Sequence, residues 1–204
     1  IEVPGAEDCP DAVFVEDAVV MFDDLAVLTN PGAAERKPEV AGVAEAISGL
    51  GLESVRISGE GTLDGGDVLK VGRTAYVGLG GRTNGAGIQQ LADHVRDRGW
   101  TVQAVTVERA LHLKSAVTAL PDETVIGWDP VVDWPGAFPR YEGMPEEGGA
   151  HVVIVGEGHL LMAASAPRTA ELLRGRGYTV TTTDISEFEK LEGCVTCLSV
   201  RVRA

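Results

Sequence analysis

The chain has 204 residues, of which 44% are hydrophobic, so it is long enough to form one domain with a well-packed core. Its 31 acidic and 17 basic residues leave a net charge of −14, which argues against a nucleic acid or a membrane surface as partner. A small cationic ligand suits this charge better. The sequence shows no apolar run of transmembrane length and no signal-peptide pattern, and we expect a cytoplasmic protein.

The three cysteines, Cys9, Cys194 and Cys197, are an odd set, which disfavours a disulfide framework and favours a reducing compartment. Cys194 and Cys197 have the Cys-x-x-Cys spacing of some metal and redox sites. A single pair without a second pair or a nearby histidine argues against zinc, and we expect no metal and no cofactor. Because the chain begins at Ile1 without an initiator Met, we also expect that an N-terminal piece is absent.

The first predicted unit is a β-hairpin followed by a helix and a strand. Two apolar runs flank the polar turn Asp23-Asp24, as in a hairpin, and later apolar side chains recur at helical spacing until Gly51 ends the helix. The hairpin is predicted at residues 19–22 and 25–28, the helix at 35–50 and the strand at 53–57.

The same order of elements recurs along the chain. The sequence from Arg96 to Val102 matches that from Arg174 to Val180, both at the end of a helix and the start of a strand. Chance similarity of α/β units is the alternative, but repeats of this length favour modules around an axis. The second unit is predicted at 68–71, 74–79, 87–98 and 101–107, a degenerate third at 115–120 and 124–127 with an irregular stretch over 129–149, and the last at 152–155, 159–163, 169–176 and 179–182.

Polar side chains precede the first strand of each unit. Residues 198–202 alternate between apolar and polar, which predicts a final strand with Cys197 at its beginning. If the units surround an axis, these side chains converge at one end of it, and a thiol, an imidazole and carboxylates together can perform nucleophilic catalysis. A buried core cysteine is the simpler alternative for Cys197 alone. The side chains that precede the strands are Glu16 and Asp17, Asp64 and Asp67, His112, and Cys197.

Four motifs resemble those of the dimethylarginine dimethylaminohydrolases, members of the guanidine-modifying superfamily with the pentein fold. The resemblance runs in the same order from Val3 to the C-terminus. It implies one catalytic domain, residues 1–204, built as an α/β propeller of ββαβ modules around a pseudo-fivefold axis. The family's first strand, helix and lid loop precede Val3 and have no counterpart here. The motifs are Phe14-Val15-Glu16-Asp17, Leu63-Asp64-Gly65-Gly66-Asp67-Val68-Leu69, Leu111-His112-Leu113-Lys114-Ser115 and Thr196-Cys197-Leu198-Ser199.

The resemblance also implies a role for each site residue. Cys197 would attack the guanidinium carbon and form a covalent thiouronium, His112 would act as general acid and then general base, and Asp64 would orient the imidazole. The guanidinium would pair with carboxylates and the substrate's own carboxylate with arginines at the rim. The expected substrate-binding residues are Asp11, Glu16 and Asp17 for the guanidinium, and Arg36 and Arg82 for the carboxylate.

Several of these residues have simpler interpretations. Glu16 and Asp17 could be turn carboxylates, Asp64 to Asp67 could form only a tight turn, and Arg36 could be a solvated charge. We interpret Asp67 mainly as a structural acceptor, with a substrate role open. Cys194 and the remaining histidines, His94, His151 and His159, are assigned no chemistry.

The motifs also separate substrates and functions. Arginine deiminases and amidinotransferases typically have His-x-Asp where this chain has Lys114, which disfavours unsubstituted arginine and favours an Nω-substituted one. Hydrolysis of dimethylarginine or monomethylarginine to citrulline and methylamine is the expected reaction. An Nω-hydroxyarginine hydrolase is the main alternative, and a deiminase-like enzyme is another. A non-enzymatic alternative is a ribosome anti-association factor with the pentein fold. Such a factor would not need Cys197 and His112, so their presence argues against it. The oligomeric state is a separate question, and a homodimer is possible.

Overall fold

The computed structural model describes residues 1–3, 6 and 8–202. Within this part of the chain the backbone forms four three-stranded sheets, joined by helices and short loops in a mixed α/β fold. In every sheet the first two strands form an antiparallel hairpin, and the third strand pairs in parallel with the second. In the described residues, no helix combines the length and the apolar character that crossing a membrane requires.

Each sheet with its connecting segments forms one module. The predicted hairpins are present in all four modules, and the predicted third strands are present in the first, second and last. In each hairpin the polar turn needs a tight backbone, as at Asp23 and Gly72, where φ is positive. The strands are β1 (Val19–Phe22), β2 (Leu25–Leu28) and β3 (Glu53–Arg56); β4 (Val68–Val71), β5 (Thr74–Leu79) and β6 (Thr101–Thr106); β7 (Val117–Ala119), β8 (Val125–Gly127) and β9 (Tyr141–Gly143); and β10 (Val152–Gly156), β11 (His159–Ala163) and β12 (Thr179–Thr183).

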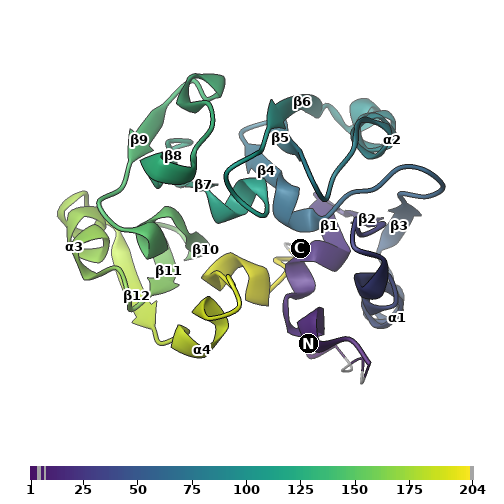
Figure 1. Cartoon of the computed structure of the whole chain (residues 1–204), viewed down its shortest axis with the longest axis horizontal. Helices are drawn as coiled ribbons and strands as arrows, with labels where there is room; N and C mark the ends of the chain where they lie inside the picture. Colours follow the sequence, from purple (N-terminus) through teal and green to yellow (C-terminus); the bar gives the residue numbers. More distant parts are fainter. Residues whose placement is uncertain (4–5, 7, 203–204) are drawn as a thin grey trace.

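In three modules an α-helix connects the second and third strands: α1 (Glu39–Gly49), α2 (Gly85–Val95) and α3 (Pro167–Gly175). Figure 1 shows these helices on the outside of the molecule and the first strands, β1, β4, β7 and β10, toward its centre. The first helix starts later than predicted, since Pro38 occupies its N-cap position and residues Ala34–Arg36 form the separate 3-10 helix η3. A short helix, α4 (Ser186–Glu189), follows the last sheet.

The hydrophobic core joins the first two modules. Phe22 and Val27 of the first sheet pack in one buried cluster with Val77 of the second sheet and Leu91 of α2. Trp100 packs edge-on against Phe22, with ring centroids 5.0 Å apart. Burial of such side chains contributes about 1.5–3 kcal/mol each, so the two modules stabilise one another.

The prediction of an irregular stretch over residues 129–149 is wrong for Tyr141–Gly143, which forms β9. Only three residues long, this strand carries no periodic signal that a sequence pattern could reveal. In place of a helix, two 3-10 helices, η7 (Asp129–Val131) and η8 (Pro135–Ala137), lead from β8 to β9. The third module therefore keeps the three-stranded sheet of the others.

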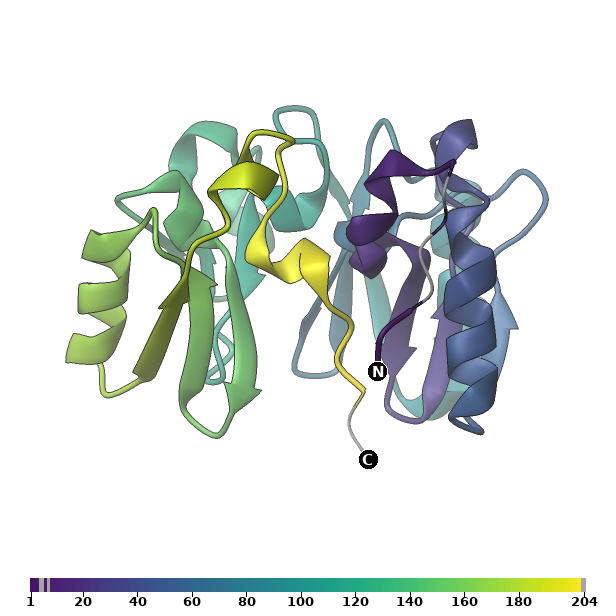
Figure 2. The ribbon, with the colours of Figure 1, turned by 90° about the horizontal axis from the view of Figure 1, so that it is seen from below.

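The prediction of a final strand at residues 198–202 is wrong. Val195–Leu198 forms a 3-10 helix, η10, and residues 199–202 belong to no strand. A strand needs a neighbour to accept its backbone hydrogen bonds, and within the described residues no strand pairs with this segment. Figure 2 shows the C-terminal segment descending between the first and last sheets.

A 3-10 helix precedes the first strand of every module, and these helices bring the reactive residues together. The helix η10 packs against η2, η2 against η4, and η4 against η6. The predicted convergence of the strand beginnings is thus realised in the backbone. These helices are η1 (Pro10–Val13) and η2 (Val15–Ala18) before β1, η4 (Gly65–Asp67) before β4, η6 (Leu113–Ser115) before β7 and η9 (Glu147–Ala150) before β10.

Candidate active site

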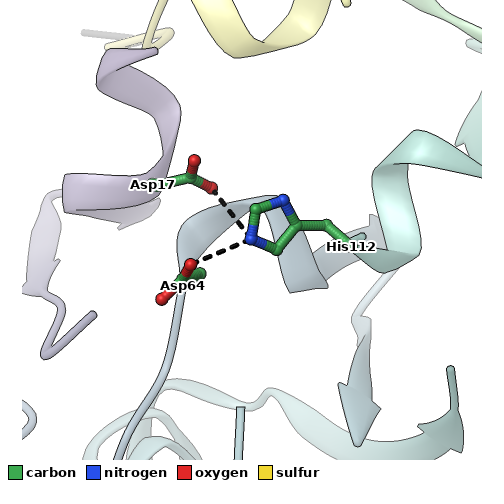
Figure 3. A group of neighbouring side chains, drawn as sticks. All are labelled: Asp17, Asp64 and His112. Carbon is green, nitrogen blue, oxygen red and sulfur yellow. Dashed lines mark hydrogen bonds and ion pairs between the residues drawn. The ribbon is translucent and has the colours of Figure 1, made fainter. Parts of the chain in front are cut away.

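His112 and Asp64 form the centre of the site. Nε2 of His112 lies 2.9 Å from Oδ2 of Asp64, and both side chains are buried (Figure 3). The other carboxylate oxygen of Asp64 accepts a hydrogen bond from the backbone N–H of Gly32 at 2.8 Å. With both oxygens bonded, the carboxylate is held in one orientation, and it fixes the imidazole through Nε2. In the described part of the chain Nδ1 has no hydrogen-bond partner, so it is the ring nitrogen free to exchange a proton.

Asp17 adds a second carboxylate to this centre. Its Oδ1 lies 3.9 Å from Nε2 of His112 and accepts the backbone N–H of Gly66 at 2.8 Å. Its Oδ2 lies 2.6 Å from Nη1 of Arg36. Burial acts to raise the pKa of Asp17, but the charges of His112 and Arg36 outweigh burial and lower it. Asp17 is therefore ionised at neutral pH.

These carboxylates keep the imidazole protonated. Burial acts to lower the pKa of His112, but the charge of Asp17, the hydrogen bond to Asp64 and the nearby Asp67 together raise the pKa to about 9. At neutral pH the ring is an imidazolium. It can give a proton to a departing amine and afterwards accept one from water.

The expectation that Arg36 lies at the rim is wrong. Arg36 is 5% exposed, and its guanidinium forms ion pairs with Asp17 and, at 2.8 Å, with Glu39. The backbone carbonyls of Asp11 and Phe14 accept two further hydrogen bonds from Nη2. Arg36 ends η3 and Glu39 begins α1, three residues later, so the two side chains meet as an i, i+3 pair. Through these bonds Arg36 fixes the position of residues 11–17, the segment that carries Asp11, Glu16 and Asp17.

Glu16 pairs with Lys114 rather than standing free. Nζ of Lys114 lies 2.6 Å from Oε1 of Glu16, while Oε2 is buried and has no hydrogen-bond partner among the described residues. Burial raises the pKa of Glu16, and Lys114 only partly opposes this effect. Both residues border a central cavity of about 880 Å³, which the first strands of the modules also line.

Cys197 lies at the end of the converging helices, in η10, and is half-buried. Its backbone N–H donates to the carbonyl of Cys194 at 3.1 Å, so the turn brings both side chains to one side. A hydrogen bond from Cys194 lowers the pKa of the Cys197 thiol, although burial and the charges of Glu16 and Asp17 act to raise it. In the parts of the chain with a described placement, no hydrogen bond joins Cys197 to His112.

The two remaining predicted residues are Asp11 and Arg82. Asp11 is half-buried in η1, next to the segment that carries Glu16. Arg82 follows β5, and its Nη1 is buried without a hydrogen-bond partner in the part of the chain that the structure describes. An unpaired buried guanidinium nitrogen is costly, which makes Arg82 a candidate to bind an anionic group.

Asp17, Asp64 and His112 each offer one atom, and these atoms lie within 4.8 Å of one another, close enough to surround a metal ion. The existing interactions of these side chains argue against metal binding. One oxygen of Asp17 is paired with Arg36, and His112, whose pKa is about 9, is positively charged at neutral pH. A cationic imidazole cannot act as a metal ligand.

Sequence reasoning missed two buried polar residues of the site. Glu39 is one, although its spacing from Arg36 is that of a helical ion pair and could have indicated it. Thr83 is the other; it is fully buried and donates a hydrogen bond to Asp67 at 2.6 Å. A lone threonine in a loop gives no signal in the sequence, because its partners come from distant positions.

Comparison with known proteins connects this geometry to one family. The family model described as arginine deiminase matches residues 36–160. A Streptomyces coelicolor protein named N(G),N(G)-dimethylarginine dimethylaminohydrolase is 61% identical over 203 residues, which cover 100% of this chain and 79% of that protein. The chain belongs to the dimethylarginine dimethylaminohydrolase family.

Other members of the dimethylarginine dimethylaminohydrolase family agree with this assignment. The Pseudomonas aeruginosa protein of that name is 34% identical, over 98% of this chain and 80% of its own length. A solved structure of a Pseudomonas aeruginosa mutant of the family, with cysteine replaced by serine, holds citrulline. It superposes with a TM-score of 0.87 at 32% identity, covering 95% of this chain and 77% of that one. The family resemblance inferred from the motifs is confirmed.

Proposed function

We propose that this enzyme hydrolyses Nω-methylated arginine to citrulline and a methylamine through a covalent intermediate on Cys197. The observation that carries this proposal is the 61% identity, along the whole chain, to a dimethylarginine dimethylaminohydrolase. The buried pair of His112 and Asp64 supports it, because the reaction needs a proton donor at neutral pH.

The first half of the reaction forms the intermediate. The Cys197 thiolate attacks the central guanidinium carbon, and a carbon–sulfur bond forms. The bond from that carbon to the substituted nitrogen then breaks, and the amine leaves with the proton of His112. Asp64 and Asp17 stabilise the charged ring before this transfer. A similar solved structure of a family member holds an adduct with S-methyl-L-thiocitrulline, which supports a covalent route for that protein.

The second half releases the product. His112, now neutral, takes a proton from water, and the water oxygen attacks the same carbon. The carbon–sulfur bond breaks, which returns the thiolate of Cys197, and the added oxygen loses its remaining proton to solvent, which leaves citrulline. The Cys194 hydrogen bond makes the thiolate a better leaving group, because it lowers the pKa of Cys197.

Two unpaired buried atoms support the binding roles. Oε2 of Glu16 lacks a hydrogen-bond donor within residues 1–3, 6 and 8–202, and a guanidinium N–H could satisfy it. Within the same residues Nη1 of Arg82 lacks an acceptor, and the substrate's carboxylate could supply one. We assign Asp11 and Asp17 to the electrostatic stabilisation of the guanidinium, and we assign Arg36 to holding Asp17.

The finer features of the fold are part of this proposal. The four described modules fit a pseudo-fivefold pentein propeller in which residues 1–204 belong to a single catalytic domain. A cytoplasmic location and a homodimer are further predictions, and analytical ultracentrifugation can check the second.

The test is incubation of the protein with arginine, Nω-monomethylarginine, Nω,Nω-dimethylarginine and Nω-hydroxyarginine, with citrulline release as the readout. We expect release from the methylated substrates and little from arginine, with Cys197→Ser as the inactive control. A clear preference for Nω-hydroxyarginine would replace the proposed substrate. Release from none of the four by the folded protein would overturn the proposed function.

A further inference from the structure

Asp67 is a buried carboxylate that the reaction described above does not use. It is 2% exposed, and both of its oxygens are bonded. Oδ1 accepts the backbone N–H of Leu113 at 2.9 Å, and Oδ2 accepts the hydroxyl of Thr83 at 2.6 Å. Leu113 is the residue directly after His112. Asp67 therefore holds the piece of backbone that carries the imidazole.

Thr83 joins Asp67 to the other carboxylate of the site. Its Oγ1 accepts the backbone N–H of Asp64 at 3.1 Å while it donates to Asp67. Its own carbonyl accepts the N–H of Gly80 at 3.1 Å, which closes the loop after β5 around it. With an exposure of 0%, the hydroxyl has no water to replace either partner. Thr83 thus connects Asp64 and Asp67 through its side chain, and the loop that carries Arg82 through its backbone carbonyl.

The space around Asp67 leaves it little freedom. A Cβ atom added at Gly78 would lie 2.5 Å from Oδ1 of Asp67, so the strand β5 packs directly against the carboxylate. The backbone N–H of Asp67 also donates to the carbonyl of Asp64 at 3.0 Å. His112 is consequently held at two points, at the ring by Asp64 and at the backbone by Asp67.

We propose that Asp67 and Thr83 are positioning residues for His112: together they hold the imidazole and Asp64 in their relative geometry, and Asp67 adds a negative charge behind the ring. This role rests on the proposed function insofar as His112 transfers protons. A merely structural role would stabilise the fold without changing the titration of His112.

The electrostatics agree with this arrangement. His112 faces three carboxylates, Asp17 from η2, Asp64 before η4 and Asp67 within η4, whereas the nearby cation Lys114 is paired with Glu16. Burial raises the pKa of Asp67 to about 6, against the lowering effects of His112, Thr83 and the Leu113 N–H. Midway between these two pKa values, near neutral pH, Asp67 is thus mostly ionised while His112 is mostly protonated.

The test is a pH titration of the His112 ring by NMR in the free, full-length chain, with the resonance assigned by its loss in His112→Gln. Replacing Asp67 by Asn removes one of the charges that favour the imidazolium, so the titration midpoint should fall by about one pH unit. Thr83→Val should also lower the midpoint and decrease kcat more than it increases KM, whereas Thr83→Ser, which keeps the hydroxyl, should resemble the parent.

Thr169→Val is the matched control, because Thr169 is also 0% exposed and its hydroxyl donates to a carboxylate, that of Glu146, at 3.2 Å. It should lower stability without moving the His112 midpoint. Unchanged midpoints in both Asp67→Asn and Thr83→Val would overturn the proposal. If Asp67→Asn does not fold, the comparison of Thr83→Val with Thr83→Ser tests the proposal instead. Because the titration needs no substrate, shifted midpoints in a chain that releases no citrulline would overturn only the proposed function.

Discussion

Nζ of Lys114 lies 2.6 Å from Oε1 of Glu16, a pair formed between the third and first modules. Their side chains are only 16% and 13% exposed, so both charges have lost most of their water. Lys114 neutralises one side of the carboxylate, and Oε2 has no hydrogen-bond partner in the described portion of the chain. The guanidinium of the substrate would therefore meet a Glu16 carboxylate that already forms an ion pair with Lys114.

Lys114→Met should destabilise the protein, because it leaves Glu16 buried without a counter-charge. Breaking a pair of this burial typically costs about 3 kcal/mol, which urea unfolding can measure. The double variant Glu16→Gln/Lys114→Met removes both charges and should recover part of the loss. Additive losses in the double variant would mean that the pair does not contribute to stability.

Asp64→Asn should lower kcat about a hundred- to ten-thousand-fold, since the imidazole loses the partner that orients it. KM should change little, because Asp64 is fully buried behind the ring. Steady-state kinetics with a methylated arginine measures both constants. Asp184→Asn, at an exposed position far along the chain, is the control and should retain parent kinetics. An equal increase in KM would assign Asp64 to substrate binding instead.

Turnover should decline as the pH rises through about 9, where His112 loses its proton. The same group affects stability. Its pKa is higher in the folded chain than the usual 6.5, so its stabilising contribution is complete below pH 6.5 and disappears as the pH rises through 9. Urea unfolding from pH 6 to 10 measures this loss, and His112→Gln should remove that part of the pH dependence. A pH profile of stability that is the same in both proteins would contradict the raised pKa.

Cys197→Ser should be inactive, because a serine hydroxyl ionises far less readily than a thiol. Cys194→Ser should retain most activity, as its hydroxyl can still donate to Cys197, whereas Cys194→Ala should raise the pKa of the Cys197 thiol. The rate of iodoacetamide alkylation as a function of pH measures this pKa. Mass spectrometry of acid-quenched turnover should find the adduct on the peptide with Cys197. An adduct confined to Cys194 would reverse the assignment.

Gly66→Ala should abolish activity, because the added methyl group has no room. Its Cβ would lie 2.6 Å from Oδ1 of Asp17 and 2.9 Å from Cγ of His112, so one of the two must move. Gly81→Ala is the matched control, since a Cβ there meets no atom of the described residues within 4 Å. Citrulline release measures the loss of activity, and the NMR signal of His112 reports any displacement of its ring. A fully active Gly66→Ala variant would show that Asp17 and His112 need not be in contact.

The sequence by itself determined the modules and the reactive residues. Alternating apolar runs and polar turns are local patterns, and they were sufficient to predict the hairpins around Asp23 and Gly72. Glu16, Asp64 and His112 lie before first strands, as the same repeat predicts, whereas Cys197 lies in η10 and no strand follows it in the described residues. The motifs around these four residues are local as well, and they were sufficient to indicate the family.

Only the tertiary structure decided how those residues are bonded. Arg36 carries no local sign that it is buried against Asp17, because that pairing depends on how the first module folds back on itself. The strand expected after Cys197 is absent for a similar reason: alternation predicts which side chains could face a core, but a strand forms only where a neighbouring strand accepts its hydrogen bonds. Thr83 acquires its place beside Asp67 through contacts across the second module, which no local pattern encodes.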